Sequence, residues 1–329
     1  MPPLTPLRLK PIYQHYLWGG RRFETVLGRI LGDAPSYAES WEVADHPDGQ
    51  SVVATGPLMG ERLSTLVSRY GEDLLGRDPV PDPAGSRPRF PLLLKYLDAA
   101  QTLSVQVHPD DARAARLAPP DFGKTEAWVV LATDPGATIY AGLRPGVDRA
   151  ALAAAVAEGR CESCLHPFQP QVGDCVFLPA GTVHALGAGL VVAEVQQASN
   201  VTYRLYDWGR PGPDGRPRHL HVAEALDAID FARGPVEPVP PQPTARQGGE
   251  RLVACEKFVL HRWRLAAPAS IGGDSRFHIL SVIAGAVEVA GDPAGRPLAL
   301  GQTLLIPAAV GPVEMRPLGE CTLLESRLP

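Results

Sequence analysis

The sequence predicts a mainly β protein, built as two jelly-roll barrels of antiparallel strands with a few added helices. The chain has 329 residues, and its 33 glycines and 35 prolines are spread along its length, which is typical of many short strands joined by turns. A Gly-x5-Pro pattern occurs twice, at 173–179 and at 301–307. It indicates an internal repeat, with coincidence as the alternative in a chain so rich in both residues. Two double-sheet units that close or cover their strand edges would account for both observations.

The expected strands are short apolar runs bounded by turn residues. They lie at 91–97, 103–108, 127–131, 175–178, 190–195 and 202–206, and later at 252–265, 277–289, 302–307 and 313–317. Helices are expected at 62–75, 111–117, 149–158 and 222–229, where apolar residues recur at helical spacing. Asp110 or Asp111 is suited to cap the second helix, Asp148 to cap the third, and Gly159 to end it.

A proline-rich segment divides the chain. Residues 1–234 are expected to form a catalytic unit with helical insertions, 235–249 an extended linker, and 250–329 a degenerate second unit of the same kind. In the second unit, Ala309 and Pro312 stand where the first repeat has Gly181 and His184. If the histidine of the first repeat binds a metal, the second unit is therefore expected to lack that metal position.

Composition excludes several classes of protein. The net charge is −5 and no basic block stands out, which argues against a nucleic-acid partner. No apolar run approaches the roughly 18 residues of a membrane helix, and the N-terminus lacks the plan of a signal peptide. We therefore expect a cytoplasmic protein without membrane contact. Five cysteines are an odd number for a disulfide framework, and Cys161 and Cys164 are interpreted as a chance pair rather than a zinc knuckle or redox pair.

The most informative motif runs from Gly173 to His184. An apolar strand at 175–178 is ended by Pro179, Gly181 permits a tight turn, and the chain then resumes an extended path. The spacing G-x5-P-x-G-x2-H resembles the second motif of the cupin superfamily, in which that histidine is a metal ligand. The resemblance makes His184 a candidate ligand.

A second group of polar residues lies on the strand expected at 103–108. Gln106 and His108 are two residues apart and share one face, with Val105 and Val107 on the opposite face. A buried polar pair without partners is costly, so it needs a ligand, a water network or a metal.

Glu126, in the stretch Gly123 to Trp128, begins another apolar strand. His108, Glu126 and His184 together form a set of two histidines and one carboxylate, which binds zinc with an open position or non-haem iron. Gln106 could complete a tetrahedral shell through its amide oxygen. The other histidines lack partner motifs and are expected to be structural, exposed or helix-capping: His15, His46, His166, His219, His221, His261 and His278.

With these motifs placed, the chain resembles the type I mannose-6-phosphate isomerases in their shorter bacterial form. The most specific matches are LSVQVHPDD at 103–111, GKTEAW at 123–128 and TYRLYD at 202–207. Shorter matches lie at 10–13, 17–20, 39–43, 90–95, 181–187 and 194–201. The resemblance covers nearly the whole chain but is loose in the C-terminal unit.

The resemblance implies a zinc enzyme of cupin fold, with one zinc ion per chain, that interconverts mannose 6-phosphate and fructose 6-phosphate. It implies that the zinc ligands are His108, Glu126 and His184. Gln106 matches the position of a fourth ligand in longer members. Arg204 matches the active-site arginine of the family, and the residues expected around the substrate are Lys95, Lys124 and Glu194.

Aldose–ketose isomerisation needs a base near C1 and C2, stabilisation of a negative oxygen, and an anchor for the phosphate. A divalent metal fits the second need. Glu194 is the first candidate for the base, because burial among apolar residues would raise its pKa toward the operating pH. The alternatives are a structural Glu194 paired with Arg204, or Lys124 or a water on the metal as the base.

The cations expected to hold the phosphate are Arg204, Lys95 and Lys124. Trp18 and Trp128 are expected in the core, with a wall of the sugar site as the alternative. A non-haem iron oxygenase would use the same ligands, and a sugar-phosphate-binding protein without turnover would use the same pocket. The expected partner is a small sugar phosphate. The oligomeric state stays open, and a monomer is compatible with the sequence.

Overall fold

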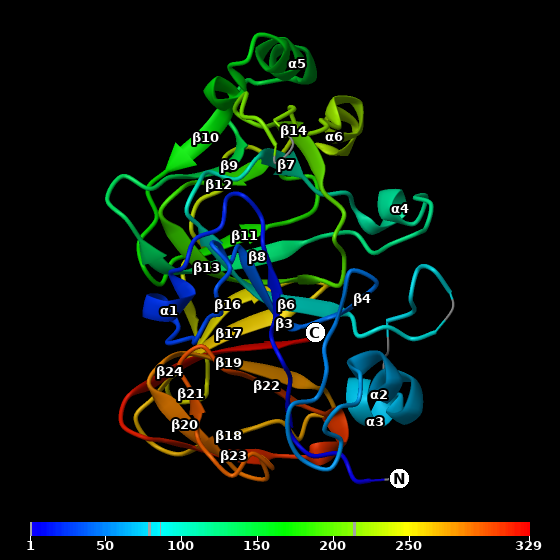
Figure 1. Cartoon of the computed structure of the whole chain (residues 1–329), viewed down its shortest axis with the longest axis vertical. Helices are drawn as coiled ribbons and strands as arrows, with labels where there is room; N and C mark the ends of the chain where they lie inside the picture. The colour runs from blue at the N-terminus through cyan, green and yellow to red at the C-terminus, as the bar shows by residue number, and fades with distance from the viewer. Residues whose placement is uncertain (1, 78–79, 86, 213–214) are drawn as a thin grey trace.

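Four antiparallel β-sheets, called A to D, follow one another along the long axis of the molecule (Figure 1). The computed structural model describes residues 2–77, 80–85, 87–212 and 215–329. Sheets A and B share one hydrophobic core, sheets C and D share a second, and another core lies between B and C. The protein is therefore mainly β and layered.

Sheets A and B carry the candidate site residues. Sheet A has the order β10–β9–β12–β7–β14, with bounds Leu165–Phe168, Ile139–Leu143, His184–Leu186, Val105–Val107 and Tyr203–Tyr206. Sheet B has the order β11–β8–β13–β6–β3–β2, with bounds Cys175–Leu178, Glu126–Thr133, Leu190–Gln197, Leu92–Ala99, Glu39–Val43 and Ile12–Gln14.

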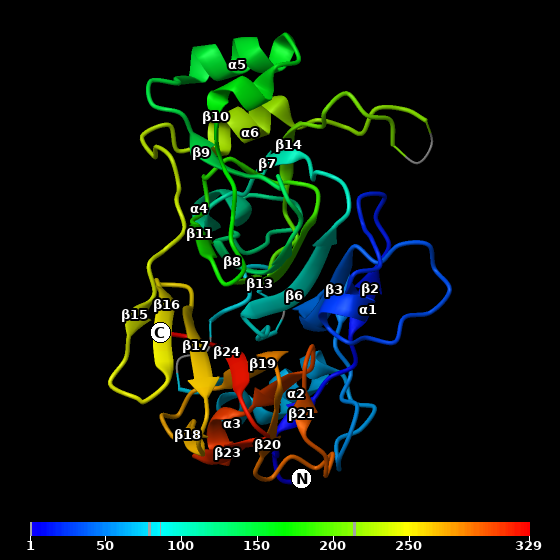
Figure 2. The ribbon, with the colours of Figure 1, turned by 90° about the vertical axis from the view of Figure 1, so that its left-hand side faces the viewer.

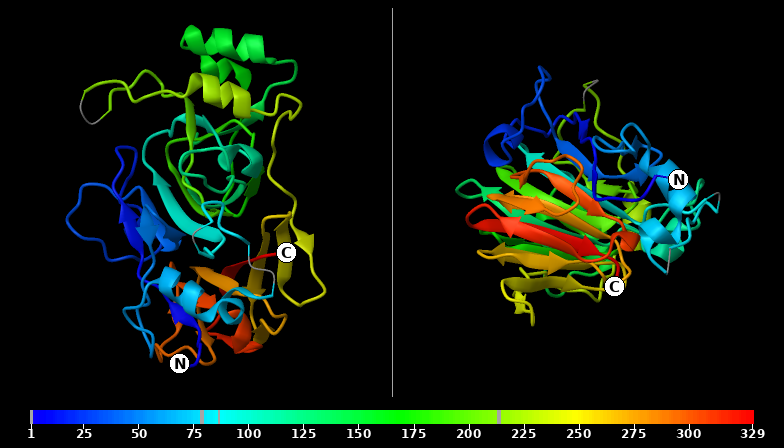
Figure 3. Two further views of the ribbon diagram at one scale, coloured as in Figure 1. Left: turned by 90° about the vertical axis from the view of Figure 1, so that its right-hand side faces the viewer. Right: turned by 90° about the horizontal axis from the view of Figure 1, so that it is seen from below.

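Sheets C and D form the other end of the molecule, where the view from below in Figure 3 shows strands running side by side. Sheet C has the order β1–β22–β19–β24–β17–β16–β15, with bounds Leu7–Arg8, Thr303–Ile306, His278–Ala284, Cys321–Arg327, Val259–Leu265, Gly249–Ala254 and Gln242–Pro243. Sheet D has the order β18–β23–β20–β21, with bounds Ala269–Ile271, Val313–Pro317, Ala286–Val289 and Leu298–Ala299. A separate hairpin joins β4 (Asp45–His46) to β5 (Gly49–Gln50).

The two-residue period of the strands in sheet B separates its core from its site. On β6, Leu94 and Tyr96 enter the core shared with sheet C, whereas Lys95 faces the opposite way and lines a pocket. In the sheet register Lys95 stands opposite Glu194 of β13, and Glu194 stands opposite Trp128 of β8. Because neighbours in register share a face, three pocket residues project from three adjacent strands.

Short helices cover the outside of the sheets. Beyond sheet A lie α5 (Arg149–Ala157) and α6 (Val222–Ala228), together with the 3₁₀ turn η1 (Cys161–Cys164), whose two cysteines are buried free thiols (Figure 2). The remaining helical segments are α1 (Phe23–Val26), α2 (Leu63–Tyr70), α3 (Glu72–Leu75), α4 (Asp111–Ala114) and η2 (Ala308–Val310). Within the described ranges, none of the helices has the length and apolar character needed to cross a membrane.

Most expected elements are present, with changed boundaries that have local causes. Strands β11 and β23 have the expected bounds. The helix expected at 62–75 is interrupted at Gly71, where φ is +49°. The runs at 252–265 and 277–289 are each two strands rather than one.

The expected helix caps are resolved by the hydrogen bonds. Asp148 accepts from the N–H of Ala151 at 2.8 Å, and Gly159 follows α5 with φ at +72°. Asp110 caps α4, which is only one turn long, by accepting from the N–H of Arg113. Asp111 is not the cap, because its carboxylate accepts hydrogen bonds from other parts of the chain.

The prediction of two closed jelly-roll barrels is not confirmed. In the part of the chain that the structure describes, each of sheets A to D is open, with two outer strands. β1 comes from the expected first unit yet pairs with β22 of sheet C. β15 comes from the proline-rich segment and forms the edge of the same sheet (Figure 2). The division into units at 234 and 250 stays a prediction.

Candidate metal centre

Three buried polar side chains converge between sheets A and B. His108 follows β7, His184 begins β12 and Glu126 begins β8. One potential ligand atom from each lies within 4.8 Å of the other two. Glu126 Oε2 is 3.4 Å from His108 Nε2, and Glu126 Oε1 is 3.2 Å from His184 Nε2. Residues from three separate motifs thus form one cluster.

The backbone of sheet A brings the two histidines together. β7 and β12 are neighbours, with His184 opposite Gln106 in register. The turn before β12 holds Gly181 at a φ of +85°, and the N–H of Gly181 donates to the carbonyl of His108 at 2.9 Å. A Cβ at Gly181 would lie 3.1 Å from the carbonyl oxygen of Ala228. The turn therefore favours glycine strongly.

Both imidazole rings present the same nitrogen to the cluster. The Nδ1–H of His108 donates to the Val201 carbonyl, and the Nδ1–H of His184 donates to the Thr182 carbonyl, each at 2.9 Å. The Nε2 atom of each ring therefore carries the lone pair. Burial, and then the nearby Lys124 ammonium, lower the pKa of His108 well below its ordinary value. His108 is neutral, which is the form that ligates a metal.

Glu126 supplies the negative charge of the cluster. Burial alone would raise its pKa, but the Lys124 ammonium, 2.6 Å from Oε2, holds the pKa of Glu126 well below its usual range. Neither carboxylate oxygen receives a well-directed hydrogen bond from the described residues. A buried carboxylate facing two imidazole lone pairs is a donor set suited to a divalent cation. These residues therefore fit a metal ion.

Gln106 lies beside the cluster. Its Nε2 atom is 3.4 Å from His184 Nε2, and its Oε1 atom accepts from Ser104 Oγ at 3.4 Å. A half-turn of the amide group exchanges its oxygen and nitrogen. The amide oxygen is therefore within reach of the same centre.

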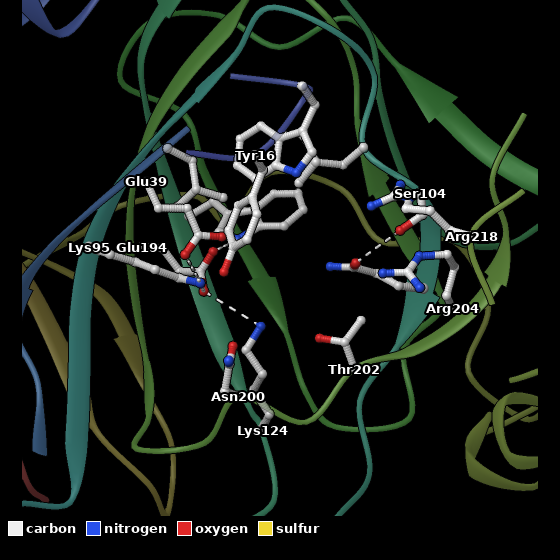
Figure 4. A pocket seen from close by; sticks show the side chains of 15 residues that line it. Tyr16, Glu39, Lys95, Ser104, Lys124, Glu194, Asn200, Thr202, Arg204 and Arg218 are labelled. Carbon is white, nitrogen blue, oxygen red and sulfur yellow. Dashed lines mark hydrogen bonds and ion pairs between the residues drawn. The ribbon is translucent and has the colours of Figure 1, made fainter. Parts of the chain in front are cut away.

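A cavity of about 300 Å³ adjoins the cluster (Figure 4). One wall carries Glu39, Lys95 and Glu194, and the opposite wall carries Arg204 and Arg218. The other lining residues are Tyr16, Trp18, Leu97, Leu103, Ser104, Gln106, Lys124, Trp128, Asn200 and Thr202. The pocket therefore offers fixed charges of both signs to a polar ligand.

Lysines and carboxylates alternate on the first wall. Glu194 Oε1 lies 3.4 Å from Lys95 Nζ and 3.6 Å from Lys124 Nζ, and Glu194 Oε2 accepts from Trp128 Nε1 at 2.9 Å. Glu39 Oε2 accepts from Lys95 Nζ at 3.2 Å. Burial, and then the charge of Glu126, raise the pKa of Glu194, whereas the neighbouring carboxylates raise the pKa of Lys95 in spite of its burial.

The cations expected for the phosphate are not all on one wall. Lys95 and Lys124 bind carboxylates, and Lys124 Nζ lies 2.6 Å from Glu126 Oε2 and 2.9 Å from His108 Nε2. Arg204 stands on the other wall and donates to the His219 carbonyl at 2.9 Å. Glu194 is thus paired with lysines and not with Arg204, the pairing considered from the sequence.

Two charged pocket residues had no assigned role in the sequence. Glu39 lies in the stretch 39–43, which carried the family resemblance without indicating a function. Arg218 comes from the long connection after β14, and Asp207 accepts its Nε–H at 2.6 Å. Its approach to Arg204 depends on the folding of that connection, so no local pattern could have indicated it. Trp18 and Trp128 both line the cavity and pack in the core of sheets A and B.

Comparisons with known proteins agree with one another and together span most of the chain. Residues 6–127 match the type I phosphomannose isomerase catalytic domain, and residues 250–328 match the mannose-6-phosphate isomerase cupin domain. Mannose-6-phosphate isomerase ManA of Bacillus subtilis is 32% identical, with 96% of this chain and 97% of the relative covered. The mannose-6-phosphate isomerase of Streptococcus mutans is 33% identical, with 93% of each chain covered. The crystal structure of a Bacillus subtilis mannose 6-phosphate isomerase superimposes with a TM-score of 0.85 at 30% identity, covering 98% of this chain and 99% of the other.

Proposed function

The chain belongs to the type I mannose-6-phosphate isomerase family, and from this premise we propose that it is a zinc-dependent enzyme. It interconverts mannose 6-phosphate and fructose 6-phosphate with one zinc ion per chain. The proposed ligands are His108, Glu126 and His184, with the Gln106 amide oxygen as the fourth. The observation that carries the proposal is the convergence of two Nε2 lone pairs on a buried carboxylate beside a charged pocket.

Zinc suits this donor set, because nitrogen and oxygen ligands are typical of zinc sites and the ion can expand its coordination to accept a substrate oxygen. When bound, the ion would stabilise negative charge on the substrate oxygens at C1 and C2. The cluster and the adjoining wall carry three carboxylates: Glu39, Glu126 and Glu194. Within that wall and cluster they face two ammonium groups, those of Lys95 and Lys124. A metal cation would balance the excess of negative charge.

Glu194 is the proposed base. In the forward direction its carboxylate removes the proton from C2 of the open-chain aldose and returns it to C1, while a proton moves between the two oxygens. Burial raises its pKa toward the range where a carboxylate exchanges protons efficiently. Trp128 fixes one oxygen of Glu194 and leaves the other facing the lysines, so the carboxylate is held in one orientation.

The phosphate is proposed to bind at the opposite wall. Arg204 has a buried Nε atom without a hydrogen-bond partner among the described residues, and Arg218 lies on the same wall. Two guanidinium groups at one wall suit a phosphate, because arginine donates parallel hydrogen bonds to its oxygens. Lys95 and Lys124 then act at the sugar end, where the proton moves.

The remaining expectations are part of the same proposal. Residues 1–234 and 250–329 are proposed as two cupin-like jelly-roll units joined by the segment 235–249, with β1 and β15 added to a sheet of the second unit. The protein is proposed to work in the cytoplasm on a small sugar phosphate. A non-haem iron oxygenase would need an oxidisable substrate and an iron ion. The charges on both walls favour a sugar phosphate instead.

The decisive experiment removes and restores the metal. Purified protein stripped with a chelator should lose conversion of mannose 6-phosphate to fructose 6-phosphate, and added zinc should restore it. Oxygen uptake with ferrous iron, measured in parallel, tests the oxygenase alternative. No conversion by fully zinc-loaded protein that still binds mannose 6-phosphate would contradict the proposal and leave a binding protein.

A further inference from the structure

The connection from β13 to β14 touches the candidate metal centre through one backbone carbonyl. In it, the oxygen of Val201 accepts the Nδ1–H of His108 at 2.9 Å. The next residue back, Asn200, lines the substrate pocket. Because the connection lies outside the β ladders, the direction of the Val201 carbonyl must be fixed by other bonds.

Ser199 supplies the first of those bonds. This fully buried side chain accepts the N–H of Val201 at 3.3 Å and donates its hydroxyl hydrogen to Asp121 Oδ2 at 3.2 Å. The contact to the Val201 N–H restrains the Asn200–Val201 peptide, which directly precedes the peptide whose carbonyl reaches His108. The orientation of the hydroxyl is set in turn by the carboxylate that accepts from it.

A buried arginine holds that carboxylate. Arg89 is 4% exposed, and its Nη1 atom donates to Asp121 Oδ1 at 2.8 Å and to the Ala198 carbonyl at 3.0 Å. His46 Nε2 lies 3.3 Å from Asp121 Oδ2. Arg89 therefore hydrogen-bonds both to the Asp121 carboxylate and to the start of the connection between β13 and β14.

Burial of the Arg89–Asp121 ion pair costs free energy, because both charges lose their hydration. The bonds of this one converge on residues 198–201. This segment contains the Val201 carbonyl, which fixes the tautomer and the orientation of the candidate ligand His108. Groups that orient metal-bound histidines in this way typically change metal affinity by about 10- to 100-fold when removed.

We propose that Asp121 and Ser199 are positioning residues for His108, acting through the carbonyl of Val201 to present its Nε2 atom to the metal. The inference rests on the proposed function, since it assigns a role toward the zinc that function requires. Neither residue lines the pocket, so the role is to hold a ligand and not to contact the substrate.

The test measures zinc affinity by competition with a chromophoric chelator, for the full chain and three variants. Asp121→Asn keeps the shape of the side chain and removes its charge. Ser199→Ala removes only the hydroxyl, so it tests the same path if Asp121→Asn fails to fold. Asp292→Asn is the matched control, because the Asp292 side chain, in the turn between β20 and β21, is only 3% exposed and pairs with Arg8 of sheet C at 2.6 Å, away from the centre.

We expect Asp121→Asn and Ser199→Ala to weaken zinc binding by about tenfold or more. In the zinc-saturated variants, KM for mannose 6-phosphate should change by less than about twofold, because the pocket lining is intact. Nitrogen-15 spectra of the histidine rings in the metal-free protein should show one fixed Nδ1–H tautomer for His108 in the parent and exchange between tautomers in Ser199→Ala. Asp292→Asn should lower the unfolding temperature and leave zinc affinity unchanged.

Equal zinc affinity in the parent and in Ser199→Ala would overturn the inference, as would an equal loss in Asp292→Asn, which would indicate general destabilisation. If the proposed function itself is wrong, the parent protein should bind zinc no more tightly than a His108→Ala variant does. This result is distinct from the loss of affinity in the variants that tests the inference.

Discussion

Lys124 Nζ lies 2.6 Å from Glu126 Oε2, inside the cluster of candidate metal ligands. The same ammonium lies 2.9 Å from His108 Nε2. Lys124 and a divalent cation would therefore contact the same two groups. Two positive charges so close together repel one another, so the site balances metal affinity against a lysine that is proposed to act in the reaction.

Replacement of this lysine should separate the two effects. We expect Lys124→Met to bind zinc about tenfold more tightly or better, because unit charges about 4 Å apart interact by about 4 kcal/mol at an effective dielectric constant near 20. Turnover should fall about a hundredfold or more, since a cation beside the reacting oxygens is lost. Chelator competition and an isomerase assay measure the two quantities. Lys10→Met, at an exposed position, serves as control, and weaker zinc binding in Lys124→Met would contradict the account.

The proposed base gives a second prediction. Glu194→Gln should lower kcat by about 10²- to 10⁴-fold, as expected for loss of general base catalysis, with little change in KM. Exchange of the C2 hydrogen of mannose 6-phosphate with deuterated water should be lost in parallel. Glu42→Gln is a matched control, because Glu42 is equally buried but pairs with Arg29. Unaltered exchange in Glu194→Gln would assign the base elsewhere.

The arginine wall predicts a defect in phosphate binding. Arg204→Ala should raise KM for mannose 6-phosphate by about tenfold or more, because hydrogen bonds to charged groups contribute about 1.5–3 kcal/mol. Arg204→Lys should recover only part of the loss, since lysine cannot donate two parallel hydrogen bonds. Zinc content, measured by elemental analysis, should stay at the parental level. A normal KM in both variants would place the phosphate at another wall.

A buried histidine in sheet C makes stability depend on pH. His278 Nδ1 lies 2.7 Å from Glu325 Oε1, and Nε2 lies 2.9 Å from Asp274 Oδ1. Burial lowers the pKa of His278, but hydrogen bonds to the two carboxylates raise it above its ordinary value of 6.5. The stabilisation is therefore complete below about pH 6.5 and is lost as the pH rises through the raised pKa of the folded state. In spite of burial, hydrogen bonding to His278 lowers the pKa of Asp274 to about 2. The contribution of Asp274 to stability is therefore lost as the pH falls from about 4 toward 2.

His278→Gln should accordingly cost about 3 kcal/mol or more of unfolding free energy near pH 6, the usual effect of breaking a buried ion pair. The difference from the parent should shrink as the pH rises above 7, and denaturant unfolding at several pH values measures it. His166→Gln, which alters a histidine paired with the exposed Glu237, serves as the control for replacing a histidine outside sheet C. A constant difference across this range would show that His278 is uncharged in the folded protein.

Local sequence patterns were sufficient for the strands that hold the metal cluster. The apolar run before Pro179 and the glycine that follows it give β11 and its turn. Alternation along β7 predicts that Gln106 lies on one face, which is the face of the pocket, and that Val105 and Val107 are buried on the other. In the repeated pattern, Gly173 and Gly301 both have positive φ, at +94° and +74°. The alternation of apolar and polar residues alone does not predict this backbone conformation, which glycine adopts readily.

Contacts between distant segments were beyond such patterns. The strands near the N-terminus and β24 lack clear alternation in the sequence, and they are held by pairing with strands far along the chain, as β1 is with β22. The same limit applies to the site. The contact of Lys124 with Glu126, the pairing of Glu194 with Lys95, and the approach of Arg218 all depend on how sheets and connections pack.

We propose above all that His108, Glu126 and His184 bind one divalent ion. Anomalous diffraction from zinc-grown crystals, with data collected on both sides of the zinc absorption edge, tests it most directly. We expect a single strong peak at bonding distance, about 2.0–2.2 Å, from Nε2 of both histidines and from the Glu126 carboxylate. A zinc peak ligated elsewhere, with these three side chains left free of metal, would contradict it.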